Sequence, residues 1–179
     1  MSAPTGAPLP SRRLRGGAVL ADPLVRELLE ARLVASLATL EPDGSVHLVA
    51  IWFALAGDAV LLATGSGSRK VANLERDPRA TLLVHDSRPG AEVCGACLEG
   101  RAEVVRGEEA APLVAAVHAK YVEPRAEEEP EVAAFFASDD VALRLRPLSA
   151  WTWDERESGS ARALRAGGGA LPLVPTTPR

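Results

Sequence analysis

Short apolar segments separated by turn residues run along much of the chain. Two strong turn signals, Glu41-Pro42-Asp43-Gly44 and Gly57-Asp58, separate three such segments and predict two successive hairpins. Strands that are joined by tight turns pair antiparallel. The expected strands cover residues 33–40, 46–55, 59–64, 80–85, 92–105, 141–146 and 150–153.

Helical spacing of apolar residues appears between these strands. Asp22-Pro23 is a typical helix start, because the carboxylate caps free amides and proline needs no amide partner there. A second short helix is expected to end at Asp77-Pro78, since the residue before a proline disfavours helical geometry. The expected helices cover residues 22–31, 68–76, 109–121 and 127–136.

Six or seven short strands with a few short helices predict a mainly β fold of the α+β type. An antiparallel set of this kind favours a closed or partly closed barrel, which removes exposed sheet edges. We expect a flexible arm over residues 1–17, one folded domain over 18–155 and a flexible tail over 156–179. Both ends are rich in glycine and proline, and the tail contains Gly167-Gly168-Gly169.

Composition and charge narrow the function class. The formal net charge of −4 offers no general attraction to nucleic acid. No segment approaches the roughly 20 uncharged apolar residues of a membrane span. The first ten residues lack the apolar core of a signal peptide, so we expect a cytoplasmic protein.

The chain has two cysteines, Cys94 and Cys97, in one C-x-x-C pattern that suits redox chemistry or half of a zinc site. None of the three histidines, His47, His85 and His118, is close to the pair in sequence. Residues three apart on a strand point to opposite faces. We therefore expect structural thiols and no metal site.

The segment with the clearest chemical signal is residues 64–74. Glycines at Gly65 and Gly67 allow the chain to turn from a strand into a short helix, whose first amides have no partner within the helix. Ser66 and Ser68 add hydroxyl donors, and the following Arg69-Lys70 adds two positive charges. This pattern is typical of a phosphate-binding corner, and the alternative is a capped surface helix with two solvated basic residues.

Aromatic residues and histidines allow more than one interpretation. Trp52 lies on an apolar strand, where it could be core or stack on a ring system. Trp151 and Trp153 share one face of the last strand, and we expect core rather than a substrate pocket. His47 and His85 could donate protons near neutral pH, although structural roles are favoured for both. His118 could line a pocket or a dimer surface, although an ordinary surface position is favoured.

Several of these features occur together in a known order. The strand–turn–strand ending in Ile51-Trp52-Phe53 is followed by Gly57-Asp58, then Ser68-Arg69-Lys70, then Asn73-Leu74 and Arg76-Asp77-Pro78-Arg79. Over residues 33–105 this order resembles the pyridoxamine 5'-phosphate oxidase-like split β-barrel family. The resemblance implies a homodimer with two cofactor sites at the interface. The implied cofactor-binding residues are Ala50, Trp52, Thr64, Ser66, Ser68, Arg69, Lys70 and Asn73, with Arg69 and Lys70 on a cofactor phosphate.

Departures from the vitamin-B6 oxidase itself narrow the expected activity. Residues 46–53 carry no arginine or lysine, whereas the oxidase has a phosphate-binding arginine there. Its substrate motifs near the C-terminus are also not apparent. The pattern looks more like the branch that uses the deazaflavin coenzyme F420, which implies hydride transfer to the activated C=C of a conjugated ketone or related cyclic metabolite. The alternatives are an FMN-dependent oxidoreductase or oxidase, and a non-catalytic protein that binds flavin, deazaflavin or haem.

Overall fold

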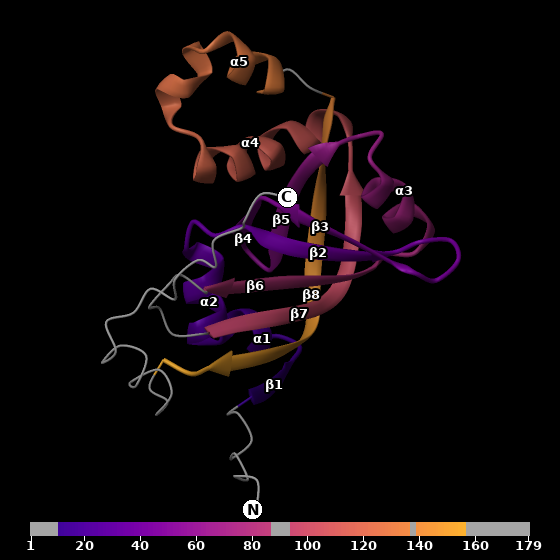
Figure 1. The fold of residues 1–179 in the computed structure, drawn as a ribbon, viewed down its shortest axis with the longest axis vertical. Coiled ribbons are helices and arrows are strands. Elements are labelled where there is room, and N and C mark those ends of the chain that lie inside the picture. The colour runs from indigo at the N-terminus through magenta and orange to yellow at the C-terminus, as the bar shows by residue number, and fades with distance from the viewer. Residues whose placement is uncertain (1–10, 87–93, 137–138, 157–179) are drawn as a thin grey trace, which may run out of the picture.

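The computed structural model describes residues 11–86, 94–136 and 139–156. In these ranges eight strands form one curled antiparallel sheet with short helices at its ends (Figure 1), which confirms the predicted fold class. The strands are β1 (Ser11–Arg15), β2 (Ala35–Leu40), β3 (Val46–Ile51), β4 (Phe53–Ala56), β5 (Ala59–Gly65), β6 (Arg79–Asp86), β7 (Cys94–Val105) and β8 (Asp140–Asp154).

The two ends of the curled sheet meet at Trp52. The strand order is β3-β2-β6-β7-β8-β5-β4, so β3 and β4 lie at opposite ends of the sheet although one residue joins them in the chain. The single strand expected over residues 46–55 is therefore wrong. It divides at Trp52 because β3 pairs with β2 whereas β4 pairs with β5. We call this point the split.

Strand β8 holds the sheet together along its whole length. It pairs with β7 throughout, with β5 through its first half and with β1 through its second half. The two strands expected over residues 141–146 and 150–153 are this one strand. The register shifts opposite Glu99 and Gly100, where Pro147 cannot donate a ladder hydrogen bond.

Helices close the ends of the barrel. Asp22 caps α2, because its carboxylate accepts hydrogen bonds from the amides of Leu24 (3.0 Å) and Val25 (3.3 Å). The predicted helices are confirmed within a residue or two, except that residues 127–136 divide between η2 and α5. The helices are α1 (Ala18–Ala21), α2 (Pro23–Glu30), α3 (Arg69–Arg76), η1 (Gly107–Glu109), α4 (Ala110–Tyr121), η2 (Pro124–Glu128) and α5 (Pro130–Phe136).

The prediction of a flexible arm over residues 1–17 is wrong for residues 11–15. Residues 11–15 form β1 beside β8, and an ion pair of 2.9 Å between Arg12 and Asp22 ties this strand to the start of α2. The local sequence is polar and basic, so its strand geometry depends on the edge that β8 presents. Residues 1–10 of the arm and 157–179 of the expected tail lie outside the described residues.

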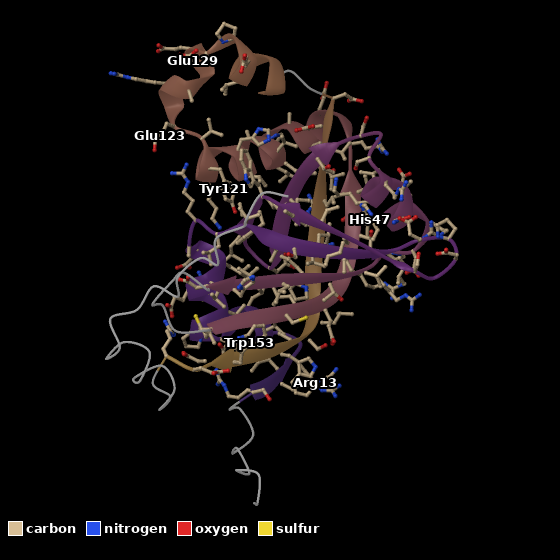
Figure 2. All side chains as sticks on the ribbon, in the orientation of Figure 1. Arg13, His47, Tyr121, Glu123, Glu129 and Trp153 are labelled. Atoms are coloured by element: carbon tan, nitrogen blue, oxygen red, sulfur yellow. The ribbon has the colours of Figure 1, made fainter. Side chains whose placement is uncertain are left out.

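The core fills the inside of the curled sheet, where Phe53, Leu37 and Leu143 are fully buried. The two tryptophans of β8 are not part of it, contrary to expectation. Thr152 and Ala150 face the core instead, and the alternating Trp151 is on the outer face, 5.0 Å from the Arg13 guanidinium. Figure 2 shows Arg13 and Trp153 at this end of the sheet. Within the described part of the chain, no helix is both long and apolar enough to cross a membrane.

Candidate cofactor site

A cavity of about 340 Å³ lies at the split. Residues on both sides of the split line it, together with one residue from α3 and one from α4. The lining residues are Val34, Ala50, Ile51, Trp52, Ala63, Thr64, Lys70 and His118. Four of the residues predicted from the sequence, Ala50, Trp52, Thr64 and Lys70, are thus brought together. Its volume lies within the range of small-molecule sites, roughly 300–1,000 Å³.

Trp52 forms a flat wall of this cavity. The Tyr121 ring stacks against it with centroids 4.9 Å apart and planes within 5°. Tyr121 is in turn fixed, because its hydroxyl lies 2.6 Å from the Leu33 carbonyl and 3.3 Å from the Phe53 amide. Trp52 therefore serves as a positioned wall of the cavity rather than as a member of the central core.

Lys70 supplies positive charge at the start of α3. Its ammonium donates a hydrogen bond of 2.8 Å to the Thr64 hydroxyl, which itself lies 3.4 Å from the Ser68 hydroxyl. Burial lowers the pKa of Lys70, and the nearby Asp140 carboxylate partly opposes this. The first amides of α3 have no partner within the helix. Together these groups form a corner that suits an anion.

The other predicted residues lie around this corner or away from it. The Arg69 guanidinium is largely exposed and lies 3.7 Å from Glu41. Ser66 donates a hydrogen bond to the Asp139 carboxylate. Asn73 is buried and donates to the Thr39 hydroxyl at 3.2 Å, so the structure gives it a packing role away from the cavity.

His118 also lines the cavity, a role that the sequence allowed but did not favour over an ordinary surface position. It is almost fully buried on α4, and its Nε2 lies 3.7 Å from the Asp140 carboxylate on β8. Its ring meets Trp52 edge-on at 6.3 Å. Burial lowers the pKa of His118 and Asp140 partly opposes it. The available signal was its place on the helix face of Val117 and Tyr121, both of which are buried.

The two cysteines lie on β7, with Cys94 buried and Cys97 partly exposed, and both thiols are free. Burial raises the pKa of each thiol, which disfavours the reactive thiolate. In the described ranges no three His, Cys, Asp or Glu side chains gather in a way that could hold a metal ion.

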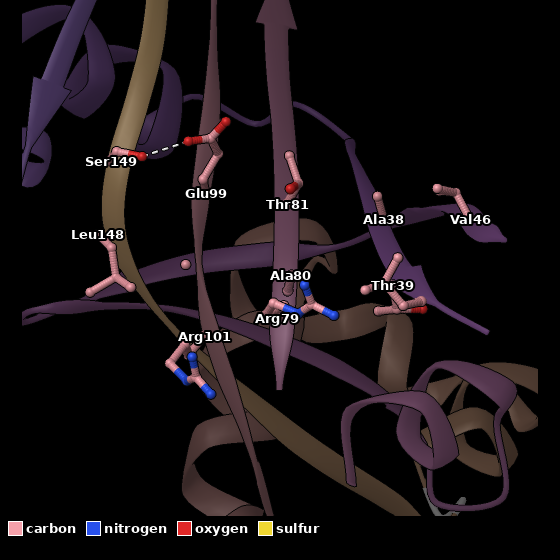
Figure 3. A pocket seen from close by; sticks show the side chains of 12 residues that line it. Ala38, Thr39, Val46, Arg79, Ala80, Thr81, Glu99, Arg101, Leu148 and Ser149 are labelled. Atoms are coloured by element: carbon pink, nitrogen blue, oxygen red, sulfur yellow. Dashed lines mark hydrogen bonds between the residues drawn. The ribbon is translucent and has the colours of Figure 1, made fainter. Parts of the chain in front are cut away.

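A second hollow, of about 420 Å³, lies on the outer face of the sheet over β2, β6, β7 and β8. Figure 3 shows its lining, with Leu148 and Val46 on opposite sides and a hydrogen bond of 2.6 Å from Ser149 to Glu99. Its lining has two basic residues, Arg79 and Arg101. The Arg79 guanidinium already donates to the Asp77 carboxylate. None of the predicted cofactor-binding residues lines this hollow.

The family model described as pyridoxamine 5'-phosphate oxidase matches residues 21–154. The chain belongs to this family. The match confirms the resemblance seen from the sequence and extends it from residues 33–105 to nearly the whole sheet. The pyridoxamine 5'-phosphate oxidase family consists of split-barrel proteins that bind flavins or deazaflavins and are related to oxidoreductases.

Solved structures that share this fold are described with different functions. A conserved hypothetical protein from Mycobacterium tuberculosis is 28% identical, with a TM-score of 0.63 over 92% of this chain and 96% of that one. An F420 reductase is 25% identical, with a TM-score of 0.53 over 70% of this chain and 94% of that one. The haem storage protein of Vibrio cholerae, at 18% identity and a TM-score of 0.56 over 74% and 91%, shares the fold alone. No curated protein matches the chain.

The residues at the split fit a flavin-type cofactor. A planar ring system needs a flat apolar wall and room beside it, which Trp52 and the small side chains of Ala50 and Ala63 provide. A phosphate on the cofactor needs a cation and donors, which the half-buried Lys70 and the start of α3 provide.

Proposed function

We propose that this protein is an F420-dependent reductase that transfers hydride from reduced deazaflavin to the activated C=C of a conjugated ketone or related cyclic metabolite. The observation that carries the proposal is the cavity at the split, which combines the Trp52 wall with Lys70 at the start of α3. The 25% identity to an F420 reductase supports it. So does β3, whose sequence has no arginine or lysine for a flavin phosphate.

In this proposal the side chains divide into two tasks. Lys70, with Ser68 and the exposed Arg69, holds the cofactor phosphate, while Trp52 and Ala50 lie along the ring system. The bound cofactor supplies the hydride. The protein orients the two reactants and excludes water, which strengthens every electrostatic interaction inside the cavity.

We further propose that the protein acts as a homodimer whose interface covers the outer face of the sheet. Four large apolar side chains on this face are exposed, namely Val46 (64%), Leu48 (63%), Leu148 (58%) and Trp151 (40%). Ala50 lies in the same row of β3 as Val46 and Leu48, because alternate residues of a strand share a face. A partner on this face would therefore reach the mouth of the cofactor cavity.

Light scattering should give a dimer for the wild type, and the double variant Leu48→Glu with Leu148→Glu should give monomers. A wild-type monomer would contradict the proposal.

The cofactor site is tested by fluorescence titration with two pairs of ligands: F420 and its deazaflavin core without phosphate, and FMN and riboflavin. Hydrogen bonds to charged groups contribute about 1.5–3 kcal/mol each, so Lys70→Ala should weaken F420 binding by roughly 10- to 150-fold. Arg69→Ala should cost less alone, because this guanidinium is exposed and faces Glu41. The double change should cost roughly two to four powers of ten.

Arg26→Ala is the matched control, since it removes one exposed arginine that pairs with Glu30 on α2, far along the chain from the site. It should leave binding unchanged. The loss in the Lys70 variant should be confined to the ligands that carry phosphate. Equal weakening of both members of a pair, or of neither, would contradict a phosphate site at this corner.

The same titrations separate the alternative functions. Tighter binding of FMN than of F420 would favour the FMN-dependent oxidoreductase. Binding of F420 without reduction of any acceptor in a broad panel of conjugated ketones would favour a non-catalytic carrier.

A further inference from the structure

The proposed reductase needs a proton as well as a hydride, and the cavity contains a group that the binding roles leave unused. His118 lines the cavity from α4, whereas Lys70 lines it from α3. Its side chain is only 9% exposed, on the buried face of α4 that also carries Val117 and Tyr121. A buried imidazole at the wall of a ligand cavity is placed to meet whatever enters.

The Asp140 carboxylate lies beside this imidazole, on the neighbouring strand. Residue 140 begins β8 and pairs with Gly65 at the end of β5, which brings its carboxylate beside the cavity. The Asp140 carboxylate lies 3.7 Å from Nε2 of His118, and its own side chain is only 12% exposed. A carboxylate at this distance stabilises the imidazole when the ring carries a second proton.

The charged groups around His118 come from a small set of elements. Asp140 on β8 favours the protonated imidazole, burial disfavours it, and Lys70 on α3 lines the same cavity. Strands β4 and β5, which α4 packs against, carry no titratable side chain. Further along β8, Arg144 is already paired with Glu109 at 2.7 Å. The pKa of the imidazole is thus set mainly by burial, by Asp140 and by any ligand that enters the cavity.

We propose that His118, positioned by Asp140, is the proton donor of the reductase, an inference that rests on the proposed function. When a conjugated ketone accepts hydride at its β carbon, the C=C electron pair moves towards the carbonyl and leaves an enolate. The enolate α carbon then takes the proton from the imidazolium. A new C–H bond forms, the N–H bond breaks with its electrons left on nitrogen, and water restores the proton to the neutral imidazole.

The environment suits this task. Burial makes the imidazolium a stronger acid than a free histidine, so it releases its proton more readily. Negative charge that develops on the substrate beside it favours keeping the ring protonated until transfer. The donation should therefore fail as pH rises through the pKa of His118.

The first test needs no turnover. The chain has three histidines, so NMR signals of histidine-labelled wild-type protein can be assigned with His47→Gln and His85→Gln, which leaves His118 by elimination. Saturating F420 should shift the His118 signals and change their pH titration. Saturable F420 binding with unchanged His118 signals would overturn the proton-donor role and leave the proposed function standing. Absence of F420 binding would instead overturn the proposed function.

The second test compares two acceptors in single turnovers of protein loaded with reduced F420. 2-Cyclohexen-1-one needs a proton on carbon, whereas the product from 1,4-benzoquinone takes its proton on oxygen directly from water. General acid catalysis contributes about 10²- to 10⁴-fold, so His118→Gln should slow the enone by that factor and the quinone little. The decline of the enone rate with rising pH should disappear in this variant.

Asp140→Asn is the second variant, and it should shift that pH decline to lower pH without abolishing it. Arg26→Ala is again the control and should behave as the wild type towards both acceptors. An enone rate that is unchanged by His118→Gln, or equal slowing of both acceptors, would overturn the role of His118 as proton donor.

Discussion

Removal of the Tyr121 hydroxyl tests how the wall of the cofactor cavity is held. The hydroxyl has one proton, which it donates to the Leu33 carbonyl at 2.6 Å or to the Phe53 carbonyl at 3.1 Å, and it accepts from the Phe53 amide at 3.3 Å. A buried group left without its partner costs about 1–3 kcal/mol. Tyr121→Phe should therefore lower the free energy of unfolding by about 1–3 kcal/mol, with the strong Leu33 bond as the main contribution.

Urea unfolding at one fixed protein concentration measures this loss. The midpoint should fall while the slope stays constant, because the phenyl ring keeps its stacking on Trp52 and the exposed surface is unchanged. Thr152→Val is the matched control, since it removes a buried hydroxyl whose contact with the Arg12 carbonyl is a weak 3.4 Å, and it should cost clearly less. Tyr121→Leu removes the stacked ring as well as the hydroxyl and should weaken F420 binding more than Tyr121→Phe does. A loss below about 0.5 kcal/mol for Tyr121→Phe, the size of an ordinary surface change, would refute this account of the wall.

Three further changes test features of the fold. Gly100→Ala would place a Cβ 2.2 Å from the backbone oxygen of Arg146, so it should destabilise the protein by about 1–3 kcal/mol in thermal unfolding, whereas Gly67→Ala, with open space around it, should not. Asp22→Ala removes the cap of α2 and should cost about 0.5–2 kcal/mol in the same assay, and an unchanged midpoint would show that the cap is dispensable. Burial lowers the pKa of Lys120 to about 8 from 10.5. The folded protein then binds fewer protons than the unfolded chain between those values, so stability should rise with pH there and Lys120→Met should flatten the rise.

Local chemistry predicted most of the elements but not how the strands are ordered. Glu41-Pro42-Asp43-Gly44 acts locally, through an Asp43 carboxylate that accepts from the Ser45 amide and a glycine with φ of 84°, and it was found from the sequence. The split at Trp52 could not be found in this way, because the apolar run on both sides continues without interruption. Only the choice of partners, β2 before it and β5 after it, divides the strand. The same holds for β1, whose basic sequence needs the edge of β8 to become a strand.

In the candidate site, too, residues that are close together in the sequence could be predicted, whereas a residue far along the chain could not. Lys70 was found because the glycine turn and the helix start lie side by side in the sequence, whereas Trp52 and Thr64 were found through the family resemblance, whose motifs follow one another closely along the chain. His118 belongs to a helix about fifty residues later along the chain, and no motif connects it to the others. Asn73 is the opposite case: it was named with the site, but its buried side chain hydrogen-bonds Thr39 outside the cavity.

The position of β8 has a consequence for the way in which the protein is made. Its 15 residues supply a partner to three strands at once, and two of these, β1 and β5, precede it by more than 70 residues. Contacts that span so much of the chain slow folding, because the loop between them must close first. On the ribosome, β5 and β7 therefore wait with unpaired edges until residue 154 has been synthesised. A chain that is interrupted before that point presents open strands to its neighbours, and aggregation or chaperone capture should be its fate rather than a partly active barrel.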